Sequence, residues 1–394
     1  MAAHFTLRLA DRMSRLGTET AFEVLCRAHA LERQGKEIIH LEIGEPDFDT
    51  PANIVEAGVN ALRDGWTHYG PSAGYPELRE AIAEEVSRTR GVAVTSDSVV
   101  VVPGGKPIIF FCILALVDEG DEVIYPNPGF PIYESMIRYA GGRAVPLRLR
   151  EEKDFGFDIN ELASLINDRT KLIILNSPQN PTGGVLSERE VRDVADIIGD
   201  RNIMVLSDEI YSRLIFEGEH QSIISVPGFQ ERTILLDGFS KTYAMTGWRI
   251  GYGVMRSDLA VHISRLMTNS NSCTASFTQR AAIEALRGDQ SSVDHMRAEF
   301  RRRRDFFVAG LSRIKGFSCR TPKGAFYVFP NISKTEWTSQ KLAHALLEEA
   351  GVACLSGTSF GAFGEGYLRF SVANSLENLD KALDCIERWT KQRL

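Results

Sequence analysis

The stretch Thr233-Ile-Leu-Leu-Asp-Gly-Phe-Ser-Lys-Thr-Tyr-Ala-Met-Thr-Gly-Trp-Arg249 joins a short apolar segment to a polar loop. The first four residues are aliphatic or β-branched without a break, which is typical of a strand buried on both faces of a mostly parallel sheet. Lys241 stands in the loop that follows. Most lysines are solvated, but the small, aromatic and apolar neighbours of Lys241 favour a partly desolvated amine with a lowered pKa.

The same strand-like pattern recurs along the middle of the chain and alternates with helical stretches. This alternation predicts an α/β fold with a mostly parallel central sheet and helices on both faces. Ser187 and Glu190 form a capping-box pattern at the start of one of these helices. The other predicted strands are 99–102, 122–125, 172–175 and 203–206, and the helices between the strands are 106–117, 131–139, 159–166 and 187–198.

The two ends of the chain have a different character, which predicts a second, smaller domain. Helical patterns at 53–63 and 76–88 precede the sheet, and others follow it at 258–267, 278–286 and 292–311. The tail mixes strand patterns at 326–329, 352–355 and 367–372 with helical patterns at 339–349 and 376–390. We predict a large domain over residues 47–287 and a small α+β domain made of residues 1–46 and 288–394.

Composition excludes several classes of partner. The chain has 394 residues, a net charge of −7 and 43% hydrophobic residues, and it lacks the basic character that nucleic acids or anionic membranes favour. No apolar run approaches the roughly 20 residues that cross a bilayer. The run 301–304 is four arginines within a helical pattern, and we interpret it as a solvated helix face. The six cysteines are scattered without a metal-ligand spacing, so we expect reduced thiols, a cytoplasmic protein and no metal site.

Polar residues follow several of the predicted strands. In open α/β sheets the ligand binds beyond the carboxyl ends of the strands, so these residues are expected to share one crevice. They are Gly104, Gly105 and Lys106 after the first strand, Asn180 after 172–175, Asp208 and Tyr211 after 203–206, and Ser240 and Lys241 after 233–236.

Each of these residues has a chemistry that suits one aldehyde cofactor. A neutral Lys241 amine can attack an aldehyde, and pyridoxal phosphate is the cofactor that uses such a lysine. A carboxylate at Asp208 would keep a pyridine nitrogen protonated, although a helix cap or a metal ligand is an alternative for this residue. Glu209 is interpreted as the solvent-facing neighbour of Asp208. Tyr211 and Asn180 could each donate a hydrogen bond to the phenolate oxygen of the cofactor.

The phosphate group of such a cofactor also has candidate ligands. Arg249 offers a two-pronged donor, and Gly105 opens a helix whose free N–H groups bind anions readily. The segment 104–107 is not a Walker A loop, because its glycine spacing is wrong and Pro107 replaces the required Ser or Thr. Each signal is weak alone, and their order and shared location make the case.

The whole pattern resembles the class I aminotransferases of the aspartate aminotransferase type, which belong to fold type I of the pyridoxal phosphate enzymes. The resemblance runs nearly end to end. Its motifs are Gly44-Glu-Pro-Asp-Phe-Asp-Thr-Pro51, Tyr69-Gly-Pro-Ser-Ala-Gly-Tyr-Pro76, Asn180-Pro-Thr-Gly183, Ser207-Asp-Glu-Ile-Tyr211, Ser240-Lys-Thr-Tyr-Ala-Met-Thr-Gly-Trp-Arg249, Gly324-Ala-Phe-Tyr327 and Tyr367-Leu-Arg369.

The resemblance implies a role for each matching residue. Lys241 would form the Schiff base and move the proton during the reaction, and Arg369 would bind the substrate's α-carboxylate with a backbone contact from Gly44. Tyr69 would reach the phosphate of the other subunit, which implies a homodimer with shared active sites. Asp208 would pair with the ring nitrogen of the cofactor, Asn180 and Tyr211 would donate to its phenolate oxygen, and Phe130 would stack on its ring. The phosphate would be bound by Gly105, Lys106 (through its backbone), Ser240 and Arg249.

Two departures from the family pattern bear on function. Gly238 stands where the family often has a phosphate-binding Ser, three residues before Lys241. Members strict for aspartate carry a second cation for the distal carboxylate, but the segment 268–277 has none and Gly17 stands where bacterial relatives can have a lysine. Glu19 lies close by, and it either points to solvent or lines the pocket and repels a dicarboxylate.

The sequence therefore predicts an aminotransferase that moves an amino group from an L-amino acid to a 2-oxo acid by a ping-pong mechanism. The donor is left open among aspartate, alanine, aromatic and other amino acids. The alternative on the same scaffold is a β-lyase or a specialised amino-acid oxidase, since a fold alone does not fix a reaction. A regulator built on this fold is disfavoured, because no basic DNA-binding segment has room before Gly44.

Overall fold

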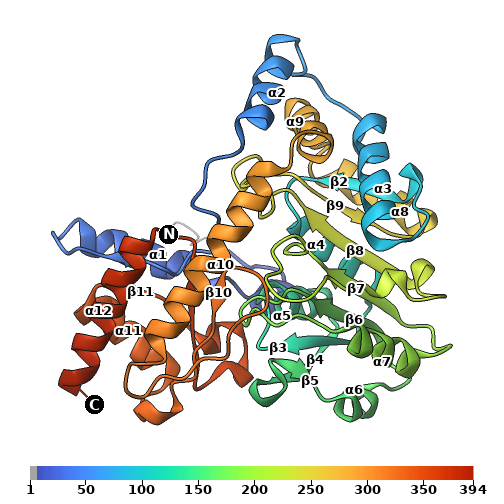
Figure 1. Ribbon diagram of the computed structural model, residues 1–394. Helices are drawn as coiled ribbons and strands as arrows, with labels where there is room; N and C mark the ends of the chain where they lie inside the picture. The colour runs from blue at the N-terminus through green and yellow to red at the C-terminus, as the bar shows by residue number, and fades with distance from the viewer. Residues whose placement is uncertain (1–6, 394) are drawn as a thin grey trace, which may run out of the picture.

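The computed structural model describes residues 7–393, and its centre is an eight-stranded sheet (Figure 1). The central strands run parallel, β9 is antiparallel to both of its neighbours, and β5 is antiparallel at the far edge. This confirms the predicted mostly parallel α/β fold. In spatial order the strands are β2 (Val99–Val102), β9 (Gly251–Val254), β8 (Thr233–Gly238), β7 (Met204–Asp208), β6 (Thr170–Asn176), β3 (Glu122–Asn127), β4 (Arg143–Arg150) and β5 (Gly156–Phe157).

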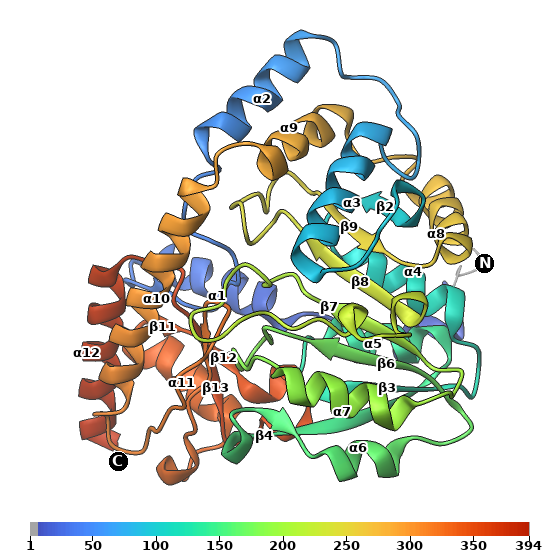
Figure 2. The ribbon, with the colours of Figure 1, turned by 45° about the vertical axis from the view of Figure 1, so that its right-hand side comes forward.

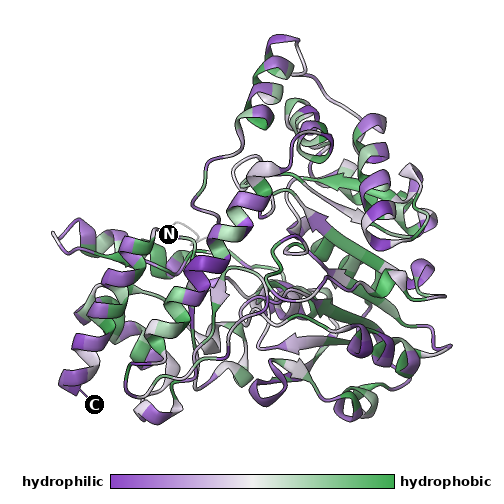
Figure 3. Ribbon diagram, in the orientation of Figure 1, coloured by the Kyte–Doolittle hydropathy of each residue, from purple (hydrophilic) through white to green (hydrophobic). Residues whose placement is uncertain are grey.

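Helices cover both faces of this sheet because successive side chains of a strand point to opposite faces. In β8, Ile234 and Leu236 pack against one helical layer, while Leu235 packs into the opposite one. The strands β7 and β8 are apolar along most of their length, and the outer sides of α3 and α7 are polar (Figure 3). One layer contains α4 (Lys106–Leu116), α5 (Ile132–Ala140) and α8 (Ser257–Ser270), and the other contains α3 (Pro76–Arg90), α6 (Ile159–Leu165), α7 (Glu188–Ile198) and α9 (Ser276–Arg287).

Helix α1 (Thr20–Glu32) packs with the C-terminal part of the chain (Figures 1 and 2), whereas the residues just before it reach α5 beside the large sheet, where Gly17 N donates to Ser135 Oγ over 2.9 Å. Leu31 of α1 contacts Leu347 and Ala353 in one small apolar cluster. The elements of this part are α1 (Thr20–Glu32), β1 (Ile39–His40), α10 (Ser291–Leu311), β10 (Tyr327–Val328), α11 (Ser339–Ala350), β11 (Val352–Ala353), β12 (Leu355–Ser356), β13 (Leu368–Ser371) and α12 (Leu376–Arg393). Helix α2 (Ala52–Arg63) does not belong to this part and packs on α9.

Two small sheets complete the fold. Strand β1 pairs in parallel with β11, and β13 lies between β10 and β12 with antiparallel pairing on both sides. All strands of the large sheet fall within 47–287, and those of the small sheets fall outside it. We propose the division into 47–287 and 1–46 with 288–394 on this basis; residues 1–6 and 394 lie outside the described residues. Among residues 7–393, no helix has both the length and the apolar character needed to cross a bilayer.

One local prediction is confirmed and another is partly wrong. The capping box of α7 is present, with reciprocal hydrogen bonds between Ser187 and Glu190. The arginine run of α10 is only half solvated, because Arg303 and Arg304 are 7% and 2% exposed. Arg303 Nη1 lies 2.7 Å from Asp47 Oδ1, and Arg304 pairs in the same way with acidic groups and a backbone carbonyl. Buried guanidinium groups are stable here because each has an anionic partner.

Candidate active site

A cavity of about 950 Å³ opens where the parallel strands end, between the large sheet and the small C-terminal sheets. The strand register aligns Asn176 of β6 with Asp208 of β7, and Asp208 with Leu236 of β8. Because carboxyl ends of parallel strands meet at one edge, the residues that follow them converge there. The shared crevice predicted from the sequence is therefore confirmed.

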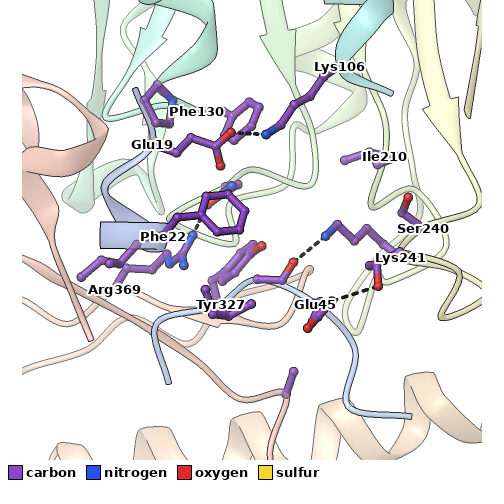
Figure 4. A pocket seen from close by; sticks show the side chains of 18 of the residues that line it. Glu19, Phe22, Glu45, Lys106, Phe130, Ile210, Ser240, Lys241, Tyr327 and Arg369 are labelled. Carbon is purple, nitrogen blue, oxygen red and sulfur yellow. Dashed lines mark hydrogen bonds and ion pairs between the residues drawn. The ribbon is translucent and has the colours of Figure 1, made fainter. Parts of the chain in front are cut away.

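Nearly all of the predicted site residues meet in this cavity (Figure 4). Tyr69 is the exception: it does not line the cavity and its side chain is 88% exposed. The predicted residues that line the cavity are Gly44, Gly105, Lys106, Phe130, Asn180, Asp208, Tyr211, Ser240, Lys241, Arg249 and Arg369.

Lys241 holds its amine at the centre of the cavity. Its Nζ donates a hydrogen bond to the carbonyl oxygen of Gly44 over 2.5 Å and lies 5.9 Å from the ring centre of Phe326. Burial lowers the pKa of Lys241 to about 8, and the nearby positive charges of Arg369 and other basic groups add to this, while Glu45 opposes it. Roughly a tenth of this amine is therefore neutral and nucleophilic at pH 7, far more than for an ordinary solvated lysine.

Asp208 is a buried carboxylate without a cationic partner. It is 4% exposed, and burial raises its pKa to about 6. Its Oδ2 accepts a hydrogen bond of 2.5 Å from the hydroxyl of Tyr133, and Oδ1 accepts one of 3.3 Å from the backbone of Ile210. Across residues 7–393, no basic side chain forms an ion pair with Asp208. A cationic group in the cavity would relieve this cost of burial.

Tyr133 was missed by the sequence reasoning. It lies one helical turn after Phe130, so both rings face the same side at the start of α5, and their ring centres are 5.7 Å apart. The i, i+3 spacing of Tyr133 from the predicted cofactor-stacking residue Phe130 is the feature of the sequence that could have indicated its place in the site.

The interpretation of Glu209 as a solvent-facing residue is wrong. Glu209 is 1% exposed and accepts hydrogen bonds of 2.7 Å from both Arg90 and His220. Burial alone would raise its pKa, but these positive partners outweigh burial and lower the pKa to about 2. Glu209 therefore forms part of a buried ionic network behind the site, which leaves Asp208 as the carboxylate facing the cavity.

One end of the cavity is suited to an anion. Gly105 caps the N-terminus of α4, where free N–H groups and the helix dipole favour negative charge. Arg249 donates to the carbonyl of Thr246 over 2.8 Å, and Ser240 is buried beside it in the cavity wall. Gly104 has a φ of +85°, and a Cβ atom there would overlap the guanidinium group of Arg249. Only glycine permits this close approach.

The opposite end of the cavity carries the buried guanidinium group of Arg369. Arg369 is 3% exposed and stacks 4.5 Å from the ring centre of Tyr327. It donates from Nη1 to Asn180 Oδ1 over 3.2 Å and from Nη2 to the carbonyl of Glu42, while its Nε has no partner. Burial lowers its pKa, and the cation therefore gains from an anionic ligand. The Tyr327 hydroxyl in turn lies 2.7 Å from that of Tyr211.

Glu19 lines the cavity, and its carboxylate pairs with the amine of Lys106. Of the two alternatives that the sequence left open for Glu19, solvent and pocket, the structure shows the pocket, where Glu19 is paired with Lys106. At the rim, the ring nitrogens of His40 form hydrogen bonds with the carboxylates of Glu42 (2.8 Å) and Glu32 (3.0 Å). The pKa of His40 rises to about 9, mainly because of the hydrogen bond with Glu42. His29, Glu32 and His40 lie close enough together to be considered as metal ligands. A protonated His40 ring, however, has no free lone pair with which to bind a metal ion.

Comparison with known proteins identifies the family. The family described as Aminotransferase class I and II matches residues 36–386. The chain belongs to this family. It is 42% identical to the aspartate aminotransferase of Pyrococcus horikoshii over 383 residues, which is 96% of each chain. It is 36% identical to aromatic-amino-acid aminotransferase 2 of Thermococcus litoralis, over 98% of this chain and 99% of that protein.

A solved structure agrees with these relationships. The alanine aminotransferase of Pyrococcus furiosus superposes with a TM-score of 0.93 at 34% identity, covering 98% of this chain and 100% of the other. The chain is therefore an aminotransferase with the fold type I architecture that its motifs predicted. The β-lyase and oxidase alternatives are not favoured, because all three of these relatives are named aminotransferases.

Proposed function

We propose that this aminotransferase uses pyridoxal 5′-phosphate, attached covalently to Lys241, to move amino groups from L-amino acids to 2-oxo acids. The observation that carries the proposal is the meeting of a buried, unpaired Asp208 and a desolvated Lys241 in one cavity. A pyridinium nitrogen is the cation that Asp208 lacks, and an aldehyde is the natural partner of the Lys241 amine.

The residues of the cavity fit the remaining parts of this cofactor. The backbone of Gly105 and Lys106, the hydroxyl of Ser240 and the guanidinium of Arg249 would hold its phosphate. Tyr211 and the amide NH₂ of Asn180 would donate to its phenolate oxygen, since Asn180 uses Oδ1 for Arg369. Phe130 would stack on one face of its ring.

When bound, pyridoxal phosphate supplies an electron-withdrawing ring that stabilises negative charge on the carbon beside the substrate's amino group. Arg369 binds and orients the α-carboxylate of the amino acid, with a backbone contact from Gly44. Once the amino group of the donor has replaced Lys241 on the cofactor, the freed Lys241 Nζ would move a proton away from the α-carbon, and its lowered pKa suits this work near neutral pH. Asp208 stays ionised and holds a proton on the ring nitrogen.

The donor belongs to the range that relatives of this family use. The proteins compared above are named for aspartate, aromatic amino acids and alanine, and we propose an L-amino acid donor with a 2-oxo acid acceptor. The free state of all six described cysteines supports a reducing, cytoplasmic location.

We also propose a homodimer with shared active sites, in which Tyr69 reaches the phosphate of the other subunit. Its 88% exposed side chain is available for this. Mixing Tyr69→Phe subunits with Lys241→Ala subunits tests it, because one site of each hybrid is then intact. Random pairing should restore activity to about a quarter of wild type. Activity no higher than the average of the two variants would refute sharing.

The chemistry itself is tested spectroscopically. The purified protein should show the visible absorbance of bound pyridoxal phosphate, lose it on addition of an amino acid alone and regain it with a 2-oxo acid. Borohydride reduction should fix the cofactor to the peptide that contains Lys241, as mass spectrometry can show. Release of pyruvate and ammonia from a donor with a leaving group, without recovery of absorbance by oxo acid, would favour a lyase instead.

A further inference from the structure

We propose that the ion pair between Glu19 and Lys106 makes this aminotransferase select donors with neutral, apolar side chains over dicarboxylic donors. The inference rests on the proposed function, because it concerns the part of the cavity that the donor's side chain would occupy. It assigns Glu19 as a specificity-determining residue.

The position of the donor's side chain follows from its two fixed ends. With the α-carboxylate on Arg369 and the α-carbon near Lys241, the side chain has to lie against the rest of the cavity wall. Glu19 and Phe22 project into this space between Arg369 and Lys106 (Figure 4). The wall residues are Glu19, Phe22, Leu25, Lys106 and Phe130.

The ion pair occupies the cation that a second carboxylate would need. The Lys106 amine donates directly to Glu19 Oε1 and lies 5.6 Å from the ring centre of Phe130. The side chain of Glu19 is only 16% exposed, whereas that of Lys106 is 47% exposed. Glu19 also directly precedes α1, where the helix dipole favours a negative charge. The Lys106 amine therefore holds the carboxylate in the cavity, and the helix dipole favours its negative charge.

Every other basic side chain that lines the cavity, within the described residues, is also engaged. Arg369 and Lys241 have the roles given above, and Arg249 donates to a backbone carbonyl at the phosphate end. His40 lies between two carboxylates, and His29 lies 4.0 Å from Glu32. A distal carboxylate would have to displace Glu19 from Lys106 or lie beside it.

The remaining surface favours apolar groups. Phe22 and Phe130 present rings to the space, and burying aliphatic or aromatic carbon against them is favourable. The Glu19–Lys106 pair has no net charge, so it neither attracts nor strongly repels a neutral side chain. We expect leucine, methionine or phenylalanine to be preferred to aspartate and glutamate by about tenfold or more in kcat/KM, which is about 1.4 kcal/mol per tenfold step.

The test compares the holoenzyme with Glu19→Gln, which keeps the shape of the side chain and frees the Lys106 amine. Glu23→Gln is the matched control, because Glu23 is an exposed glutamate in the first turn of α1, four residues after Glu19, and does not line the cavity. The measurements are kcat/KM for leucine, phenylalanine, aspartate and glutamate, and the Kd of succinate from its effect on the visible absorbance.

In Glu19→Gln the ratio of kcat/KM for aspartate to that for leucine should rise by about tenfold, and succinate should bind more tightly by a similar factor. Glu23→Gln should change neither. Adding Lys106→Gln to Glu19→Gln should abolish the gain, because the freed amine is then absent.

Three results would overturn the inference while leaving transamination intact: a wild-type preference for aspartate, an unchanged ratio in Glu19→Gln, or a gain that persists in the double variant. A wild-type protein that loses no absorbance with any donor would instead refute the proposed function, and this inference with it.

Discussion

Replacing Tyr133 with Phe should weaken the binding of pyridoxal phosphate by about twofold to tenfold at pH 7. The change removes the hydroxyl that donates to Asp208 over 2.5 Å, and it keeps the ring that packs 5.7 Å from Phe130. A hydrogen bond to a charged group contributes roughly 1.5–3 kcal/mol, which corresponds to about one to two pKa units.

The sign follows from which form of Asp208 the hydroxyl stabilises. The hydroxyl donates to the ionised carboxylate, so its loss raises a pKa that burial already places at about 6. Near neutral pH more of the variant's Asp208 is then protonated and unable to pair with a ring-nitrogen cation. The pH at which cofactor affinity falls on acidification should therefore move upward by about one to two units.

The assay is a spectral titration of the apoenzyme with pyridoxal phosphate over a pH series. Tyr243→Phe is the matched control, because Tyr243 is also buried and hydrogen-bonded, to Gln290 over 3.3 Å, but does not line the cavity. It should leave affinity and pH dependence at wild-type values. If Tyr133→Phe matches wild type in both, Tyr133 does not position or tune Asp208.

Three further predictions concern basic residues. Because burial lowers the pKa of Lys241 to about 8 and an unfolded lysine titrates near about 10.4, the unfolded state binds more protons in between, and apoprotein stability should rise with pH over this window. Lys241→Met should flatten that rise in urea unfolding, and an equal slope in both proteins would contradict it. Arg369→Met should raise KM for every amino donor by about a hundredfold with little change in cofactor affinity, and steady-state kinetics with an unchanged KM would exclude its role. Arg303→Met should destabilise the protein by about 1–3 kcal/mol because it removes a buried guanidinium that is hydrogen-bonded to Asp47 and Glu299, whereas the exposed Arg301→Met should cost less than about 0.5 kcal/mol in the same unfolding experiment.

Three strands of the large sheet were not predicted: the two-residue β5, and β9 and β4, which lack a clear local signal. Strand β9 has the sequence Gly-Tyr-Gly-Val, and glycine has a low strand propensity, so its place between β2 and β8 is set by pairing alone. Strand β4 alternates arginines with apolar residues around Pro146 and lies near the sheet edge, next to the short β5. In both cases tertiary contacts override a weak local signal.

By itself, the sequence determined five of the eight strands of the large sheet, the crevice at their carboxyl ends and eleven of the residues that line it, including Lys241. Short apolar runs bounded by turns favour strands buried on both faces, and parallel strands bring the residues after their carboxyl ends to one edge. Only the tertiary structure decided where individual charges point. Glu19 and Lys106 are 87 positions apart, and Glu209 turns inward to Arg90, 119 positions away. Local sequence sets the type of an element, but the partner of a charged side chain depends on how distant elements pack, because the groups that stabilise a buried charge usually come from another part of the chain.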